Sequence, residues 1–277
     1  MMFSVVSVVL NDADGILKTA NSIIAQSNKN YEWIIIDGGS HDETLQEIKQ
    51  IQKIKPIVYS EIDNGIYDAM NKGIDAAKGE YLIFMNAGDS FANQYVLEIL
   101  EHELATKLVD VVLGGTYQHI NNCMFYRRPK NINWIVHGLP AFHQSTVYKT
   151  ALLRSQNYSL DFILLSDYEW LSYRCSQGVT VGYLNYPISN FFVGGLSYTN
   201  IWLKFKESYR IKYTVLRESK LWSIISAIHA VSKTLIVMYV LYMVCGFFKG
   251  SSNSRIMKYG RDTLTIEYYK HPKSSGL

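Results

Sequence analysis

Four apolar runs alternate with helical patterns over residues 1–90, and this alternation constrains the fold more than any other feature. "FSVVSVVL" and "YEWIIID" are continuous and rich in β-branched residues, which is typical of strands buried on both faces. The short connections favour an α/β fold, in which a mostly parallel sheet carries helices on both faces. The predicted strands cover 3–10, 31–37, 56–61 and 81–86, and the predicted helices cover 15–27, 45–54 and 65–79.

The following residues, 110–200, are more irregular. "DVVLGGTYQHI" and "CMFYRRP" predict the two strands of a hairpin, and "VTVGYLN" predicts a further strand over 179–185. "SDYEWLSYRCSQG" predicts a helix over 166–178 that ends at a glycine. "GLPAF", over 138–142, is similar to a strand. We expect this half to complete the domain.

Composition and missing motifs exclude several protein classes. With 48% hydrophobic residues the chain can form a full core, so global disorder is not expected. Cys123, Cys175 and Cys245 lie far apart, which gives no zinc knuckle or disulfide framework and indicates a reducing compartment. The first residues, "MMFSVVSVVLND", lack a basic segment and cleavage site, and therefore predict a strand instead of a signal peptide. The motifs GxxxxGK[ST], GxGxxG, GxSxG and HExxH are all absent, which disfavours a P-loop NTPase, a dinucleotide dehydrogenase, an α/β-hydrolase and a zincin.

The net charge of +3 conceals an asymmetry between two parts of the chain. Residues 1–200 carry 14 Lys and Arg against 20 Asp and Glu, a net −6, whereas residues 201–277 carry 13 against 4, a net +9. A basic tail on an acidic body indicates an anionic partner, such as lipid headgroups or nucleic acid. The tail has no nucleic-acid recognition motif and contains an apolar run, so we expect no nucleic acid.

Two segments of the tail suggest a membrane. "LWSIISAIHAVSK" keeps Ser223, Ser226, His229 and Lys233 at helical spacing, so we expect an amphipathic helix. "TLIVMYVLYMVCGFF" is apolar all round but shorter than the about 18 residues of a confident spanning helix. Basic residues on both sides would place both ends in the cytosol. We expect an interfacial or re-entrant helical pair on a cytoplasmic protein, peripheral or monotopic at the inner membrane; the alternative is a helix that covers the protein's own core or a dimer interface.

Polar side chains lie where the predicted strands end. Ligands of open α/β sheets bind beyond the carboxyl ends of the strands. Four polar or acidic ends at one edge would form the lip of a cleft. These residues are Asn11, Asp37, Glu61 with Asp63, and Asn86 with Asp89.

Several separated blocks resemble the inverting family 2 glycosyltransferases, which have the GT-A fold, a Rossmann-like mixed sheet with helices on both faces. The resemblance spans roughly residues 3–200 and is similar to bacterial exopolysaccharide, capsule and O-antigen transferases, including those of the colanic-acid type. It implies a GT-A domain over 1–200, with a nucleotide-sugar half (1–109) and an acceptor half (110–200), followed by a basic, apolar helical tail (201–277). The blocks are "SVVLND", "EWIIIDGGSHDET", "SEIDNGIYDAMNKGIDAAKGEYLIFMNAGD", "HQS", "SDYEWL" and "FFVGGLS".

The resemblance implies a donor site for a UDP- or GDP-linked sugar. Asp37 would accept a hydrogen bond from the nucleotide base, although it could also cap the turn at Gly38 and Gly39. Asp68 and Asn71 are three residues apart on the third helix and share a face. That face could equally be exposed to solvent. The implied donor-binding residues are Asn11, Asp37, Gly39, Asp63, Gly65, Asp68, Asn71 and Asn86.

The corner "NAGD" departs from the family's DxD metal motif. Asn86 stands at the first acid and Gly88 at the second, so only Asp89 keeps a charge. Enzymes of this fold usually use Mg²⁺ or Mn²⁺ on the diphosphate, and the resemblance assigns that metal to Asp89. The alternative is a turn or helix-capping acid. We expect weak metal binding that tightens when the diphosphate is present.

Inverting transfer needs a base for the acceptor hydroxyl, and motif register assigns Asp167. The family usually has Glu-Asp where this chain has Ser166-Asp167; Glu169 is the rival, and a plain helix cap is the alternative. At the start of a helix the dipole should lower the pKa of Asp167, which would keep it ionised but weaken it as a base.

His143, Gln144 and Ser197 are expected to contact the acceptor or diphosphate, although a core histidine and a plain Gly-rich loop are equally compatible. The sequence thus predicts an inverting glycosyltransferase that acts on a lipid-linked saccharide at the cytosolic membrane face in cell-surface polysaccharide biosynthesis, with a homodimer as one assembly open to it. The alternative is a catalytically weak or inactive GT-A-like protein that binds sugar nucleotide or a partner enzyme in an assembly complex.

Overall fold

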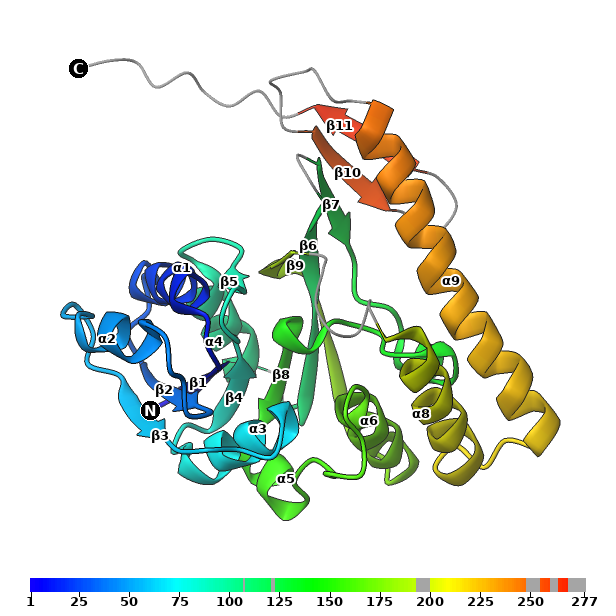
Figure 1. The fold of residues 1–277 in the computed structure, drawn as a ribbon, viewed down its shortest axis with the longest axis horizontal. Coiled ribbons are helices and arrows are strands. Elements are labelled where there is room, and N and C mark those ends of the chain that lie inside the picture. Colours follow the sequence, from blue (N-terminus) through cyan, green and yellow to red (C-terminus); the bar gives the residue numbers. More distant parts are fainter. Residues whose placement is uncertain (107, 121–122, 193–199, 248–254, 260–263, 269–277) are drawn as a thin grey trace.

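One large mixed sheet organises the chain (Figure 1). The computed structural model describes residues 1–106, 108–120, 123–192, 200–247, 255–259 and 264–268. The sheet order is β11-β10-β7-β6-β8-β4-β1-β2-β3, and β9 pairs with both β5 and β6. The strands are β1 (Phe3–Val9), β2 (Tyr31–Asp37), β3 (Ile57–Ser60), β4 (Tyr81–Phe84), β5 (Ser90–Phe91), β6 (Val111–Ile120), β7 (Cys123–Arg127), β8 (Thr146–Lys149), β9 (Val181–Phe192), β10 (Arg255–Tyr259) and β11 (Leu264–Tyr268).

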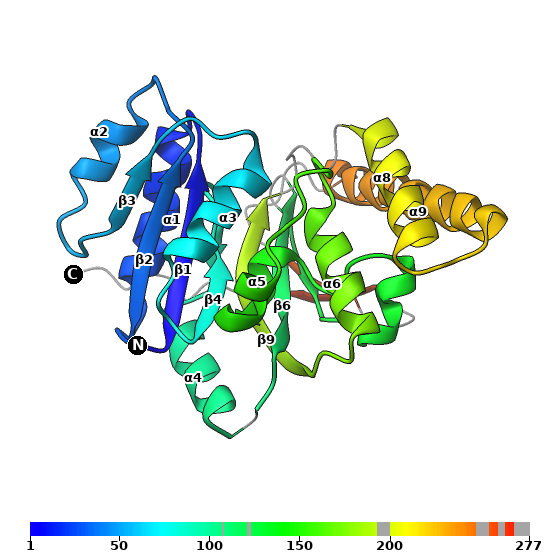
Figure 2. The same ribbon diagram turned by 90° about the horizontal axis from the view of Figure 1, so that it is seen from below.

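The helices cover both faces of the sheet, as the sequence predicts (Figure 2). The expected helices over 15–27, 45–54 and 65–79 are present, but each has different ends, and α2 is only one and a half turns long. The α-helices are α1 (Ala13–Ile24), α2 (Thr44–Lys49), α3 (Ile66–Ala76), α4 (Val96–Thr106), α5 (Thr150–Ser155), α6 (Ser166–Ser176), α8 (Ile201–Thr214) and α9 (Lys220–Phe247), with 3₁₀ turns η1 (Ile132–His137) and η2 (His143–Ser145).

β1 lies between β2 and β4 and pairs with both in parallel. All seven of its residues are buried, which explains its continuous apolar sequence. Alternate side chains serve two core layers: Val5 packs toward α1 and α4, and Val6 packs toward α3. The predicted parallel pairing is confirmed for these strands.

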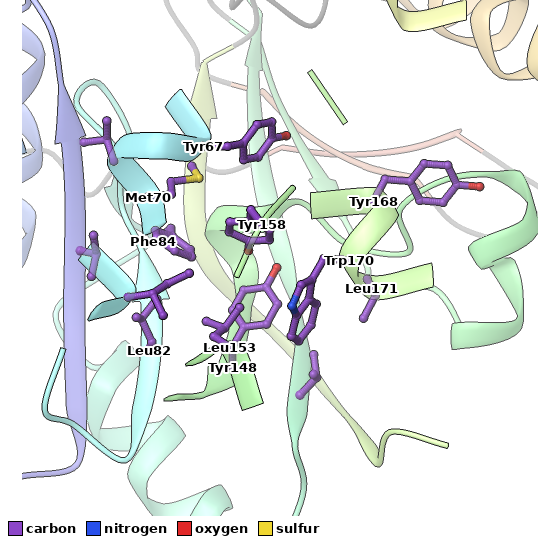
Figure 3. Packing of buried hydrophobic residues seen from close by; sticks show 14 of the residues in the cluster. Tyr67, Met70, Leu82, Phe84, Tyr148, Leu153, Tyr158, Tyr168, Trp170 and Leu171 are labelled. Atoms are coloured by element: carbon purple, nitrogen blue, oxygen red, sulfur yellow. The ribbon is translucent and has the colours of Figure 1, made fainter. Parts of the chain in front are cut away.

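An aromatic cluster joins the two halves of the domain between α3 and α6 (Figure 3). Tyr158 lies at its centre, with its ring centroid 5.4 Å from that of Tyr67 and 5.8 Å from that of Phe84. Trp170 of α6 is fully buried and stands edge-on to Tyr148. These contacts fix the start of α6 relative to β4 and α3.

The second half differs from the sequence prediction in two places. β9 continues to Phe192 instead of ending near 185, and its register against β6 shifts at Gly114 and Gly115. "GLPAF" is not a strand, because Gly138 has a φ of +134°, and the strand in this region is β8, after η2. β8 pairs antiparallel with β4 and β6, which makes the sheet mixed.

The tail is helical over α8 and α9, and it also contains two strands that the sequence does not predict. β10 and β11 extend the sheet beyond β7, whose edge offers unpaired N–H and C=O groups to Arg255–Tyr259. α9 is one continuous helix, so the amphipathic and apolar segments are not separated into a pair. Within the residue ranges given above, no helix is long and apolar enough to cross a membrane.

α8 packs against α6 and α9, and the domain boundary near residue 200 stays a prediction. The buried Lys212 ammonium donates to the carbonyl of Val136 in η1. The exposed Arg210 pairs with Asp161 in the loop before α6 at 2.9 Å. α8 thus contacts the acceptor half directly.

Gly79, between α3 and β4, offers a test of the packing at β1. An added Cβ would lie 2.5 Å from the backbone of Phe3 and Ser4, where no flexible side chain can yield. We expect Gly79→Ala to lower the free energy of unfolding by about 2 kcal/mol in urea titrations. Gly182→Ala, whose Cβ would meet the Val109 side chain at 3.3 Å, is the matched control with a smaller loss. Equal midpoints for the two variants would contradict the packing.

Candidate active site

The ends of β1 and β2 are tied together by Asn11. This residue adopts a left-handed conformation with φ +49°, which lets the chain turn directly after the strand. Its Oδ1 accepts from the His41 N–H at 2.8 Å, and its own N–H donates to Ser40 Oγ at 2.8 Å. Asn11 therefore positions the loop after β2 at the predicted edge.

Asp37, at the end of β2, is fully buried and holds the turn that follows. Its carboxylate accepts from the Ser40 N–H at 3.1 Å, the Gly39 N–H at 3.3 Å and the Ser60 hydroxyl at 2.7 Å. Gly39 has a φ of +86°, a conformation that suits glycine. These are the contacts of the turn-capping alternative, and the contact with a nucleotide base stays a prediction.

The loop before α3 lies against this turn. Asp63 accepts from the Gly65 N–H at 2.9 Å, and a Cβ on Gly38 would come within 2.3 Å of its other carboxylate oxygen. Asp68 accepts from the Asn64 N–H at 2.9 Å and lies 3.7 Å from Lys72. The structure thus brings Asp63 and Gly65 to the Asp37 turn, whereas Asp68 serves the start of α3.

Asn71 has a different position from the other predicted donor residues. Its amide nitrogen donates to the carbonyl of Tyr158, and its amide oxygen accepts from the Tyr158 N–H, both at 2.9 Å. These bonds tie α3 to the segment that leads into α6. The structure does not bring Asn71 to the strand ends.

The corner after β4 is braced by neighbouring backbone. Gly88 has a φ of +87°, and its N–H donates to the Gly15 carbonyl at 3.0 Å. The Thr19 hydroxyl of α1 lies 3.0 Å from the Asn86 carbonyl oxygen and 2.6 Å from that of Asp89. The corner is therefore a fixed element of the edge, with Asn86 and Asp89 held in place.

His143 and Gln144 of η2 lie against this corner. His143 Nε2 is 3.3 Å from Asn86 Nδ2, and burial lowers the pKa of His143 to about 4, so the ring is neutral. Gln144 is fully buried and donates from Nε2 to Asp89 Oδ1 at 3.4 Å. Its amide oxygen, Oε1, is buried without a hydrogen-bond partner among the described residues. The structure thus brings together four predicted residues: Asn86 and Asp89 from the corner after β4, and His143 and Gln144 from η2.

The electrostatics of Asp89 depend on burial. Burial raises the pKa of Asp89 to about 7, while the nearby Lys18 ammonium and the Gln144 amide act in the opposite direction. Lys18 of α1 donates to the Gly88 carbonyl at 2.7 Å and lies 3.1 Å from the centroid of the Phe192 ring. Sequence reasoning missed Lys18, because a single helical lysine carries no motif.

Asp167 lies in the first turn of α6 and is almost fully buried. The Tyr67 hydroxyl donates to Asp167 Oδ1 at 3.0 Å, and the Tyr168 N–H donates to the same oxygen at 2.8 Å. The cap of α6 is Leu165, so the plain capping alternative for Asp167 is wrong. Tyr67 was not predicted, although it lies inside the "GIYDAMNKG" block.

The predicted direction of the Asp167 pKa is wrong. Burial raises the pKa of Asp167 to about 6, and this effect outweighs the hydrogen bonds from Tyr67 and Tyr168, which lower it. The helix dipole was expected to dominate. The rival acid, Glu169, is partly buried beside Arg210 and Asp161, and burial raises its pKa as well.

Glu207 of α8 supports the start of α6. Its buried carboxylate accepts from the N–H groups of Ile163, Leu164 and Leu165 at 2.7, 3.0 and 2.9 Å. Lys204, one turn earlier, interacts electrostatically with Asp167. Sequence reasoning missed both residues; the single acid in the basic segment "KFKESYR" was the available signal.

One further prediction, Ser197, concerns the rest of the site. Ser197 lies outside the described residues. Arg127, at the end of β7, stacks on Phe142 with 4.4 Å between the guanidinium and the ring centroid. Across the described residues, no three His, Cys, Asp or Glu side chains come together as a metal-binding group. A metal at the corner would instead use Asp89 and the unpartnered Gln144 Oε1, both hard oxygen ligands that suit Mg²⁺ or Mn²⁺.

Comparisons with known proteins place this chain in a family. The Glycosyl transferase family 2 profile matches residues 4–165, which include the ends of β1, β2 and β4 and the loop before α6. A PGL/p-HBAD biosynthesis glycosyltransferase of Mycobacterium bovis is 29% identical over 211 residues, covering 72% of this chain and 80% of the relative. A putative teichuronic acid biosynthesis glycosyltransferase, TuaG of Bacillus subtilis, is 32% identical over 103 residues, covering 36% and 41%.

Solved structures give the same answer for the fold. S. aureus TarS 1–349 in complex with UDP-GlcNAc matches with a TM-score of 0.65 at 17% identity, covering 80% of this chain and 69% of that one. The mannosyltransferase PcManGT of Pyrobaculum calidifontis, in complex with GDP-Man and Mn²⁺, matches with a TM-score of 0.62 at 14% identity, covering 87% and 80%. This chain belongs to glycosyl transferase family 2 and is a glycosyltransferase with the GT-A fold.

Proposed function

We propose that this enzyme transfers a sugar, with inversion, from a nucleoside diphosphate to a hydroxyl of a saccharide acceptor in cell-surface glycan biosynthesis. The observation that carries the proposal is the buried Asp167 carboxylate, held by Tyr67 and with its pKa raised to about 6. The names of the mycobacterial and Bacillus relatives support a surface glycan as the product.

Asp167 is the proposed general base. At neutral pH most Asp167 carboxylates are ionised, and a raised pKa makes this group a stronger base than an exposed aspartate. Tyr67 and Tyr168 both donate to Oδ1, so we assign Oδ2 to the acceptor hydroxyl. In the proposed step the carboxylate takes the hydroxyl proton while the acceptor oxygen attacks the anomeric carbon from the face opposite the leaving diphosphate.

Asp89 and Gln144 are the residues that would hold Mg²⁺ or Mn²⁺ in this enzyme. When bound, such an ion supplies positive charge to the departing diphosphate. The neutral His143 and Asn86 would add uncharged contacts beside it. The Mn²⁺ bound with GDP-Man in PcManGT supports this assignment, although that likeness concerns the fold alone.

The ligands of the structural neighbours and the composition of the tail support the proposed donor and acceptor. UDP-GlcNAc in one structural neighbour and GDP-Man in another support a UDP- or GDP-linked donor. A lipid-linked saccharide acceptor and a cytoplasmic enzyme at the membrane face are parts of the proposal that rest on the tail's composition. The binding-only alternative has one observation in its favour, the loss of acids at Asn86 and Gly88. The buried base favours catalysis.

Asp167→Asn tests the base. In the natural enzyme the charged Asp167 carboxylate destabilises the folded state above about pH 6, because folding raises the pKa of Asp167 from 3.8 to about 6. We expect the variant to lose roughly 10²–10⁴-fold in kcat. Its free energy of unfolding at pH 8 should be equal or higher, by up to about 3 kcal/mol, and the difference should vanish in acid. Asp161→Asn, an exposed acid in the preceding loop, should retain activity. Full transfer by Asp167→Asn would refute the assignment.

Tyr67→Phe tests the hydrogen bond to the base. The Tyr67 hydroxyl lowers the pKa of Asp167, so its removal should raise that pKa further. With Mn²⁺ saturating, kcat/KM of the natural enzyme should fall as pH drops below about 6, and in Tyr67→Phe the fall should begin about one pH unit higher. Tyr173→Phe, on the exposed side of α6, is the control. Identical pH profiles for all three proteins would exclude this coupling.

Asp89→Asn tests the metal corner by calorimetry. One carboxylate gives few charged ligands, so Mn²⁺ should bind weakly alone and at least tenfold more tightly with UDP or GDP present. Asp89→Asn should lose that gain, whereas Asp75→Asn, at the exposed end of α3, should keep it. Equal Mn²⁺ affinity with and without nucleotide in the natural protein would count against a metal at this corner.

A further inference from the structure

α9 carries polar side chains toward the protein, the reverse of an ordinary surface helix. Ser223 is fully buried, and its hydroxyl donates to the Ser219 carbonyl at 3.0 Å. Ser226 donates to the Glu218 carboxylate at 2.8 Å, and Thr234 Oγ1 accepts from Lys204 of α8 at 3.2 Å. Ala227, also fully buried, adds the small apolar contact. As far as Thr234, the described inward side chains of α9 are therefore mainly small, and most carry a hydroxyl group.

The outward face of α9 is apolar. Its large exposed side chains lie on one side of the helix in two groups, 221–228 and 235–239, so they form a stripe along about five turns with Ser232 between the groups. Their exposed fractions range from 44% to 68%. The outward stripe consists of Leu221, Trp222, Ile225, Ile228, Leu235, Ile236 and Tyr239, with the exposed His229 at its border.

A contiguous exposed stripe of this kind marks an interaction surface. In Figure 1, α9 runs along the outer flank of the molecule, with α8 beside it. The two helices are in direct contact, so α9 cannot be surrounded by lipid on all sides without leaving α8. The surface fits a partner that covers one side of a helix only.

Exposed aromatic and basic side chains also occur on α8 and at the start of α9. Trp202 of α8 is 64% exposed and stacks on Phe205, with the Lys206 ammonium 5.3 Å from the centroid of the Trp202 ring. Arg217 and Lys220 are exposed between the two helices. Apolar residues flanked by tryptophan and cations are the composition of helices that lie in a lipid interface, where anionic headgroups attract the basic side chains.

Charge disfavours a second copy of the chain as the partner. A two-fold contact would place the same surface of each protomer against the other. Residues 201–277 carry 13 basic and 4 acidic side chains, so this contact would bring two strongly positive segments together. An anionic bilayer has the opposite charge and complements them.

We propose that the outward stripe of α9, together with Trp202, seats α9 parallel to the surface of an anionic lipid bilayer. This inference names the surface that would hold the enzyme at the proposed membrane location, and it rests on the proposed function. α8 bonds both to α9, through Lys204, and to the segment before Asp167, through Glu207. A protein bound in this way would hold Asp167, at the start of α6, on the side of the molecule that faces the bilayer. A lipid-linked saccharide would be presented there.

Vesicle flotation of the full chain tests this. The natural protein should float with vesicles of phosphatidylcholine and phosphatidylglycerol, and much less with phosphatidylcholine alone. The double variant Trp222→Gln with Ile228→Gln should bind anionic vesicles at least tenfold more weakly. The matched control, Leu108→Gln with Leu160→Gln, removes two apolar side chains elsewhere that are on average more exposed than Trp222 and Ile228, and it should float normally.

Donor hydrolysis by the same variants separates this inference from the proposed function. The α9 variant should hydrolyse its sugar nucleotide at the natural rate in detergent-free buffer, because the stripe lies outside the base and metal sites. Equal flotation of the variant and the natural protein would overturn the proposal. So would equal binding to neutral and anionic vesicles, or a soluble dimer, by light scattering, that the α9 variant abolishes.

Discussion

The parallel pairing of β1 with β2 and β4 is the constraint on which the site depends. Its register sets Val9 against Asp37 and Val6 against Phe84, so three strands end at one edge. All seven residues of β1 are buried, and a shift by one residue would exchange the side chains of its two core layers. This cost fixes the positions of Asn11, the Asp37 turn and the corner after β4.

Burial of charge then connects this edge to the second half. Asp167 and Glu207 are both carboxylates with little exposure, but they have different surroundings. Glu207 accepts three backbone hydrogen bonds and has a structural role. Asp167 accepts fewer, and burial leaves its pKa raised. The fold thus gives one buried acid three backbone hydrogen bonds and leaves the other with a raised pKa, and the first positions the loop that leads to the second.

The sequence predicts the strands, their polar ends and the motif acids, because these depend on local pattern. It does not predict the direction of the Asp167 pKa, since that depends on an aromatic cluster whose members are far apart in the chain. The contact from Tyr67 to Asp167 spans 100 residues and has no local signal. Helical spacing predicts an amphipathic segment over residues 221–233, but periodicity alone cannot say that Ser223 faces inward and Trp222 outward.

In the proposed reaction, the corner after β4 would serve a diphosphate with a single acid, Asp89. Asn86 and Gly88 remove two negative charges from the family's motif, which weakens a metal site but also reduces repulsion of the phosphates. Lys18 places a positive charge at the Gly88 carbonyl, beside Asp89. In the proposed reaction a larger share of the neutralising charge therefore comes from the protein and from the ion that the donor itself recruits. Under this proposal the substrate would complete the site, and Gln144 Oε1 would gain a partner when the donor and the ion are bound.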